Sequence, residues 1–353
     1  MRINAWCEKF TGKMSLWQIL LLAICAFLLV GTASLSLGQI EIPVEHVLAF
    51  LCQQVNLPFY QDVALTPEQV AVLYYIRLPR TLVGFLVGAG LAASGAVMQA
   101  IFSNPLADPG IIGVSSGASF GAVVAIALGL TELSMFYMPF CAFTGALAGV
   151  CITVFLAMRQ GKVPAMALLL SGVVVGMFLA AMTSGILTMI DNQKLQQYLF
   201  WTIGSLDYRR WDHVVLGIGP IAAGLILMFL MARQLNVLVL GDIEAKTVGM
   251  PVTAYRLVLL AVASMTTATG VCISGNIGFV GLVVPHMMRF LVGPDHYRLL
   301  PVSIVAGGTF LVLCDCLGRV ISPPIEIRAG IMTAFLGTPY FLYLLRKNCR
   351  LNT

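Results

Sequence analysis

The segment GDIEAKTVG, Gly241 to Gly249, places three charged residues and a Lys-Thr pair between glycines in a very apolar chain. Phosphate-binding loops use such a pair, with backbone N–H groups and the lysine holding the phosphates of a nucleotide. That pattern requires glycine directly before the lysine and again five residues earlier, where this sequence has Ala245 and Leu240. The segment therefore does not predict ATP binding, and we expect no cofactor on this chain itself.

Four other residues could carry chemistry, and their spacing favours structural roles. Cys314 and Cys316 are two residues apart, so a helix points their thiols to different sides, and no metal site is predicted. Asp315 lies one helical turn before Arg319, which predicts a local ion pair. His286 follows a proline and is expected to satisfy the kinked backbone. No cluster of nucleophile, base or ligands indicates an enzyme.

The composition requires lipid as the solvent for much of the chain. Of 353 residues, 59% are hydrophobic and only 10% are charged, whereas a soluble domain has about a quarter charged. The net charge of +5 is spread along the chain, so nucleic acid is not an expected partner. We therefore predict an all-α membrane protein.

About ten segments are long and apolar enough to cross a bilayer, which needs roughly 20 residues each. Together they predict one transmembrane domain over residues 1–353, with a short N-terminal tail (1–15) and a long outer loop (38–75). Small residues repeat every four positions within several spans, as at Gly84 and Gly88, which favours close helix packing. The ten spans are expected near 16–37, 81–102, 110–130, 136–157, 164–189, 213–232, 255–274, 277–292, 299–318 and 329–345.

The distribution of lysine and arginine predicts that both termini lie inside. With an inside N-terminus, thirteen of the 20 basic residues fall on the cytoplasmic side and seven on the outer side. The spans from residue 82 to residue 232 are nearly empty of ionisable groups. Ion-coupled carriers usually need buried carboxylates or proton relays, so an ion-coupled secondary transporter is the disfavoured alternative.

Three long motifs resemble one family of transporters. They are IRLPRTLVGFLVGAGLAASGAVMQAIFSNPLADPGIIGVSSGASFG (Ile76 to Gly121), GNIGFVGLVVPHMMRFLVGPDHYRLLP (Gly275 to Pro301) and IMTAFLGTPYFLYLLR (Ile331 to Arg346). From about Ile40 to Lys347 the chain resembles the FecCD-type permease subunits of ATP-binding-cassette (ABC) importers for iron–siderophores, haem and cobalamin. The resemblance implies a multi-pass protein of the bacterial cytoplasmic membrane that does not itself hydrolyse ATP.

The resemblance also implies partners and a contact site. Such permeases pair with a second copy or a homologue, bind two cytoplasmic ABC ATPase subunits, and receive cargo from an extracytoplasmic substrate-binding protein. A short element between spans six and seven sits in a cleft of the ATPase, and it matches residues 240–251 here. GDIEAKTVG would then sense movement of the ATPase. The expected coupling residues are Asp242, Glu244, Ala245, Val248 and Gly249.

Basic residues on the outer face of the family dock acidic groups of the binding protein. The matching positions are Arg77, Arg80 and Arg319, where complementary charges would speed encounter and fix register. The alternative is that Arg77 and Arg80 anchor a helix end at the headgroups. The chain departs from the family at Arg328, which replaces a proline. Arg328 would either add a docking charge or pair with Glu326.

The translocation path and the cargo are the least determined features. Gln99, Ser171 and Gly172 are the candidates for lining the path, the latter two because they match a path-lining helix of the family. The resemblance favours an iron–siderophore as cargo, with haem or cobalamin as the alternatives. Specificity in such systems resides mainly in the binding protein, so the permease sequence carries little of it.

Overall fold

A computed structural model describes residues 15–60 and 62–349, with side chains as far as residue 342. The predicted N-terminal tail falls on residues 1–14, outside the described residues, apart from Ser15. Across the described residues the chain is helical and forms no strand except an isolated bridge between Arg159 and Lys162. The all-α fold class predicted from composition is confirmed.

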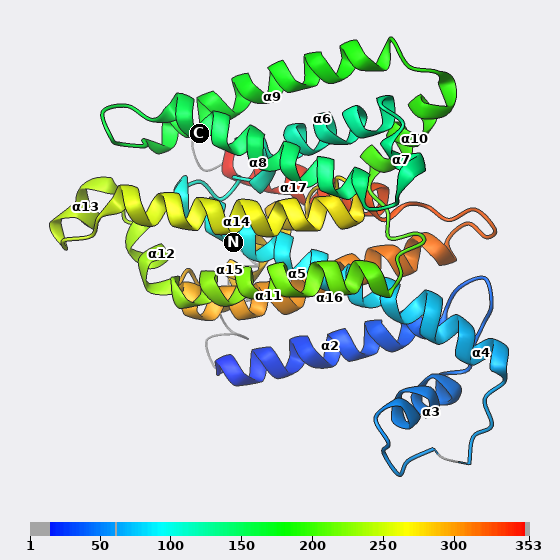
Figure 1. The fold of residues 1–353 in the computed structure, drawn as a ribbon. Coiled ribbons are helices and arrows are strands. Elements are labelled where there is room, and N and C mark those ends of the chain that lie inside the picture. The colour runs from blue at the N-terminus through cyan, green and yellow to red at the C-terminus, as the bar shows by residue number, and fades with distance from the viewer. Residues whose placement is uncertain (1–14, 61, 350–353) are drawn as a thin grey trace.

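Ten apolar helices form the bundle, and each corresponds to one predicted span (Figure 1). Seven helical stretches of the described chain are long and apolar enough to cross a membrane, and three shorter apolar helices accompany them. In chain order the ten helices are α2 (Leu16–Ser36), α5 (Leu78–Ile101), α6 (Val114–Ala127), α8 (Tyr137–Ala157), α9 (Ala165–Leu187), α11 (Trp211–Leu230), α14 (Val252–Ser274), α15 (Val280–Val292), α16 (His296–Val320) and α17 (Ala329–Cys349).

Shorter helices lie between them at the two ends of the bundle. Those outside the spans are α3 (Val44–Gln54), α4 (Pro67–Ala71), the π-helix η1 (Val72–Arg77), the 3-10 turn η2 (Pro109–Ile112), α7 (Leu130–Leu133), α10 (Asn192–Ile203), α12 (Ala232–Leu238) and α13 (Asp242–Thr247). In Figure 1, α13 lies at one end, together with the start of α2 and the end of α17, whereas α3, α4, α7 and α10 lie at the other. We call these the α13 end and the α3 end.

The outer loop predicted at 38–75 is more ordered than the sequence indicated. The main helix of this region is α3, which begins at Val44. Helix α4, η1 and α5 then run on without a break, so that one helical stretch extends from Pro67 to Ile101. Helices α10 and α12 were not predicted, since their polar residues interrupt the apolar runs.

Helix α5 occupies the centre of the bundle and is buried on every side from Val87 to Ile101 (Figure 1). Its sequence, rich in glycine, alanine and serine, lets neighbouring backbones come close, which is how helices associate in lipid. A Cβ atom at Gly95 would overlap the backbone of Gly281 in α15, and one at Gly88 would overlap Gly307 in α16. The absence of side chains at these positions is therefore what fixes the central packing.

Replacing Gly95 by alanine is expected to separate α5 from α15 and to destabilise the protein by about 1–3 kcal/mol, the usual cost of overpacking. The matched control is Gly185→Ala in α9, where a Cβ atom meets nothing within 4 Å. Thermal unfolding in lipid nanodiscs measures both. Equal melting temperatures for the two variants would contradict the assigned role of Gly95.

Candidate functional site

Helix α13 forms the middle of the predicted coupling element, residues 240–251. Gly241 and Gly249 flank it with φ angles of 110° and 79°, which glycine adopts without steric cost. Its two acidic residues lie in the first turn and Lys246 in the last, the order that the helix dipole favours. The segment is thus a short helix at the tip of the α13 end (Figure 1).

The surface of α13 is apolar in part, and one of the predicted coupling residues is buried beneath it. Ile243 is 75% exposed and Val248 69% exposed, and Glu244 is exposed beside them. Ala245 is fully buried and belongs to the main hydrophobic core. Ala245 therefore holds α13 against the bundle, and its predicted role in coupling stays a prediction. Sequence reasoning missed Ile243, although an isoleucine between two acidic residues was a usable signal.

A buried arginine connects α13 to the rest of the bundle. Arg256, on α14, is 3% exposed and forms an ion pair with Asp242 through two hydrogen bonds. The same guanidinium donates to the backbone oxygen of Val163 at 2.8 Å, just before α9 begins. One side chain thereby joins α13, α14 and the start of α9.

Replacing Asp242 by asparagine is expected to loosen α13, because Arg256 then keeps only the neutral Val163 oxygen. Hydrogen exchange of the amides in 242–249 should accelerate about tenfold, since hydrogen bonds to charged groups contribute roughly 1.5–3 kcal/mol when buried and less at this half-exposed carboxylate. Lys246→Gln, an exposed charge change on the same helix, is the control. Unchanged exchange in Asp242→Asn would rule out the connection.

The ion pair between Asp242 and Arg256 also predicts that the stability of the fold depends on pH. The hydrogen bonds from Arg256 lower the pKa of Asp242 below its ordinary value. A lowered carboxyl pKa stabilises the fold above the unfolded-state value of about 3.9 and loses that effect as the pH falls through the native value. The free energy of unfolding of the wild type should therefore exceed that of Asp242→Asn throughout the neutral range. The two values should converge only in acid well below pH 4, which thermal unfolding at a series of pH values would measure.

At the α3 end, the three arginines predicted to dock a binding protein are not exposed as that prediction assumed. Arg77, Arg80 and Arg319 are all buried, at 5–8% exposure. Arg77 donates to the backbone oxygens of Leu35, Ser36 and Ile40, and Arg319 donates to those of Ser34 and Leu37. These oxygens lie at and just beyond the C-terminus of α2, where a helix leaves carbonyl groups unpaired and its dipole favours cations. Docking of a partner at this end stays a prediction, but Arg77 and Arg319 hold α2 in place.

Arg80 is the centre of an ion-pair network. Its guanidinium contacts Asp315 at 2.8 Å, Asp207 at 2.7 Å and Glu326 at 2.8 Å. Asp315 is 3% exposed and also lies 3.3 Å from Nε of Arg319, which confirms the predicted local pair. The network joins α5, α16, the 204–210 loop and the 321–328 loop, so Arg80 positions all four segments.

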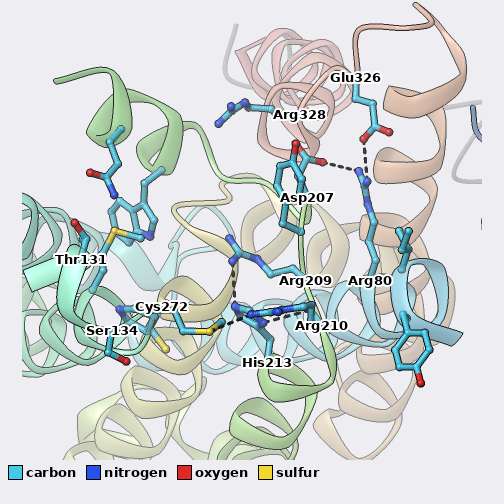
Figure 2. Close-up of a pocket in the computed structure, with 18 of the residues that line it drawn as sticks. Arg80, Thr131, Ser134, Asp207, Arg209, Arg210, His213, Cys272, Glu326 and Arg328 are labelled. Atoms are coloured by element: carbon cyan, nitrogen blue, oxygen red, sulfur yellow. Dashed lines mark hydrogen bonds and ion pairs between the residues drawn. The ribbon is translucent and has the colours of Figure 1, made fainter. Parts of the chain in front are cut away.

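Beside this network lies a cavity of about 1060 Å³, lined by polar and apolar groups (Figure 2). Its charged lining consists of Arg80, Arg209, Arg210, Arg328, Asp207 and Glu326. Figure 2 shows Arg209 and Arg210 beside His213, with Asp207 and Glu326 directed towards Arg80. No sequence pattern predicted this cavity, because its walls come from segments separated by more than 200 residues.

Arg328, the residue that departs from the family pattern, does not pair with Glu326, which is bound to Arg80. Its guanidinium lies 4.1 Å from the centre of the Phe200 ring and donates to the Phe200 carbonyl. Arg328 therefore connects the loop before α17 to helix α10. Of the two predicted roles, pairing with Glu326 is wrong, and a docking charge stays a prediction.

The three path candidates do not gather at one surface. Gln99 is 3% exposed and donates to the Leu282 backbone oxygen at 3.1 Å, bracing α5 against α15. Gly172 is buried, and a Cβ atom there would overlap Ile111 in the 3-10 turn before α6. Ser171 is half-buried. Gln99 and Gly172 make packing contacts in this structure, and a role in the path stays a prediction for all three residues.

Among the described residues, no group of three His, Cys, Asp or Glu side chains is placed to hold a metal ion. The His286 ring packs edge-on against Phe290 at 5.0 Å, and both ring nitrogens are buried without a hydrogen-bond partner. The expected hydrogen bond from His286 to the kinked backbone is therefore not formed. Cys314 and Cys316 are buried thiols, as their positions in an apolar run predicted.

Sequence comparisons identify the family of this bundle. The model of the FecCD transport family matches residues 24–347. The chain is 44% identical to the cobalamin import system permease protein BtuC of Halobacterium salinarum, over 79% of this chain and 75% of that protein. It is 41% identical to the hemin transport system permease protein HmuU of Yersinia pestis, over 77% and 82% of the two chains. The vitamin B12 import system permease protein BtuC of Escherichia coli K12 is 38% identical, over 80% and 86%.

A solved structure agrees with these matches. It is an inward-facing conformation of an ABC transporter of the metal-chelate type, with a TM-score of 0.82 and 30% identity, covering 94% of this chain and 99% of that one. The match thus covers nearly all of this chain. The ion-coupled carrier is thereby set aside, and the chain belongs to the FecCD transport family of ABC transporter permeases.

Proposed function

We propose that this chain is the membrane subunit of an ATP-driven importer that carries a bulky metal chelate across the bacterial cytoplasmic membrane. The observation that carries the proposal is helix α13, whose exposed Ile243 and Val248 stand at one end of a bundle matching metal-chelate permeases. An apolar pair on a protruding helix suits a groove in a partner. That partner is a cytoplasmic ABC ATPase, present in two copies, which binds and hydrolyses the ATP.

The transport step follows from the contacts of α13. ATP-driven closure of the two ATPase subunits displaces α13, and Arg256 passes this displacement to α14 and the start of α9. Only interactions that differ between two states can shift an equilibrium between them. The ATPase would supply that difference at α13, and the helices would respond as rigid elements because their packing is close.

The remaining partners are a second permease copy or a homologue, and an extracytoplasmic binding protein that delivers the cargo. Helix α9 supports pairing, since Met166, Leu170, Val174, Met177 and Phe178 are all 59–69% exposed on one described chain. An apolar helix face of this kind is covered by lipid or by another helix. A path between two copies is wide enough for a chelate that a single packed bundle could not pass.

The cargo is a metal chelate of the siderophore, haem or cobalamin type. Two of the relatives named above are cobalamin permeases and one is a haemin permease, and the related structure is of the metal-chelate type. These names support the class and favour tetrapyrrole-like cargo. The iron–siderophore expected from the sequence stays a prediction within the same class.

The test is purification of the chain from its native membrane in mild detergent, followed by mass spectrometry of the proteins that accompany it. We expect a soluble ABC ATPase in stoichiometric amount and an extracytoplasmic binding protein. Proteoliposomes containing the complex are then given ATP and one of three cargoes: cyanocobalamin, haemin or a ferric siderophore. ATP-dependent uptake of one of them is expected, and the binding protein's affinities should rank the three in the same order.

Two outcomes would contradict the proposal. A chain that purifies without an ATPase, yet moves solute down an ion gradient, would show that its energy source is different. An assembled complex that hydrolyses ATP but takes up none of the three chelates would reject the cargo class and leave the ATP-driven mechanism standing.

A further inference from the structure

Three arginines around the cavity at the α3 end have no carboxylate partner. Among the described residues, both carboxylates that line the cavity, Asp207 and Glu326, form their ion pairs with Arg80. Arg209, Arg210 and Arg328 form no ion pair in this part of the chain. The cavity lining thus carries four arginines against two carboxylates that are already engaged.

The contacts that Arg209 and Arg210 make are weak, whereas Arg328 also donates one hydrogen bond to the Phe200 carbonyl. Nη1 of Arg209 lies 3.3 Å from Nε2 of His213, its Nη2 lies 3.5 Å from the Ser205 carbonyl, and its Nε is buried without a partner. Arg210 contacts the sulfur of Met135 at 3.1 Å, and a thioether is a poor acceptor. Arg328 stacks on the Phe200 ring. Each guanidinium therefore has donors to spare.

His213 cannot satisfy both of its arginine neighbours. Its Nδ1 lies 3.3 Å from the backbone nitrogen of Arg210, while its Nε2 faces Arg209. A neutral imidazole has one acceptor nitrogen and a protonated one has none. In every protonation state at least one of these donors is left without an acceptor. Burial of the Arg209 guanidinium also lowers its pKa, as expected for a cation short of partners.

The same wall of the cavity holds one more unpaired donor, the indole nitrogen of Trp201, which is buried without a partner. Figure 2 shows Arg209 and Arg210 directed into the space between the α10–α11 loop and helix α7. Leaving a buried cation unpaired costs free energy, and an oxyanion recovers it through charge-assisted hydrogen bonds. These unpaired groups are all hydrogen-bond donors, and a negatively charged oxygen is the acceptor that forms the strongest bonds with them.

We propose that this cavity is a receptor for an oxyanion, chiefly a carboxylate, held by Arg209 and Arg210 with Arg328 at its rim. The proposal deepens the proposed function, on which it rests only for the source of the anion. A carboxylate on the chelate cargo is one source, and an acidic side chain of the delivering protein is the other. Planar guanidinium groups suit both, since they bind carboxylates through two parallel hydrogen bonds.

The first experiment uses the purified permease alone in lipid nanodiscs, with citrate as the probe and sodium chloride of equal ionic strength as the reference. A ligand that binds only the folded state raises the melting temperature, so citrate should raise it for the wild type. Arg210→Gln, at an exposed position, should weaken citrate binding about tenfold, as should Arg209→Gln. Non-specific stabilisation by citrate acts on every variant equally and cancels in this comparison.

The matched control is Arg233→Gln, an exposed arginine at the α13 end, which removes the same charge far from the cavity. It should keep the full response to citrate. If Arg209→Gln fails to fold, Arg210→Gln still decides the result. An identical citrate response in wild type, Arg210→Gln and Arg233→Gln would overturn the proposal. The citrate experiment needs neither cargo nor partner protein. A negative result would therefore contradict the oxyanion receptor without contradicting the proposed transport function.

The second experiment identifies the source of the oxyanion in the assembled importer. Haemin carries free carboxylates, and its dimethyl ester has the same ring without them. If Arg210→Gln removes a preference for haemin over the ester in uptake, the carboxylate belongs to the cargo. If instead it weakens the binding protein about tenfold without changing that preference, the carboxylate belongs to the delivering protein. No change in either measurement would contradict the oxyanion receptor.

Discussion

Replacing Ile243 and Val248 by aspartate is expected to abolish ATP-driven uptake and to release the ATPase from the permease. Ile243 lies on α13 and Val248 directly follows it. Their side chains are 75% and 69% exposed. Residues that act as hot spots at the centre of an interface cost about 2 kcal/mol or more each when they are lost, so with both acting in this way the pair should weaken association a hundredfold or more. ATPase retained on immobilised permease, and uptake by proteoliposomes, measure the effect.

The matched control for this pair is Met189→Asp. Met189 is 85% exposed at the opposite end of the bundle, and its replacement adds one aspartate to an exposed apolar position, as each half of the double variant does. It should retain ATPase and uptake at the level of the wild type, and Ile243→Leu should do so as well because it conserves volume and polarity. If the double aspartate variant keeps its ATPase, α13 is not the contact surface and the coupling role of residues 240–251 is wrong.

Replacing Arg80 by methionine is expected to cause the largest loss of stability of any single charged position in the described chain. It leaves Asp315, which is 3% exposed, facing only the more distant Arg319, and releases Asp207 and Glu326. Breaking a buried ion pair by removing one partner costs about 3–5 kcal/mol, because a charge stays buried without compensation. Thermal unfolding in nanodiscs should show a large fall in melting temperature.

Two further variants test the reason for this loss. Arg80→Met combined with Asp315→Asn removes the uncompensated charge and should recover a substantial part of the stability, so the two substitutions should not be additive. Arg210→Ala, an exposed arginine at the same end, should change the free energy of unfolding by no more than about 0.5 kcal/mol. A loss in the double variant equal to the sum of the single losses would count against the network.

The two predictions concern opposite ends of one bundle, and the central packing connects them. Arg80 lies at the start of α5, whose middle packs without intervening side chains on α15 and α16. Arg256 lies at the start of α14, which also packs along α5. Because close-packed helices with no intervening side chains shift as units, changes at α13 should reach the α3 end through α5 and α14. Distances between spin labels at the two ends, with and without ATP, would measure this.

The sequence alone was sufficient for the fold class, the ten spans and the family. Apolar runs of bilayer length, empty of charge, have few stable structures other than helices in lipid, and the IRLPR and GNIGFVGLVVPHMMRF motifs have a specific order and spacing. It also identified residues 240–251 as an unusual segment. These features are local in the chain, so composition and motif reveal them without knowledge of which helices are neighbours.

Only the tertiary structure decided what the charged residues do. Arg77, Arg80 and Arg319 read as surface charges because their neighbours in sequence are loop residues, yet their partners in space lie on α2, α16 and two distant loops. Ala245 and Ile243 differ in burial although they are two residues apart. The cavity with Arg209 and Arg210 is built from six separate segments. Hydrogen bonds and burial depend on which segments meet, and a single sequence without its packing does not specify that.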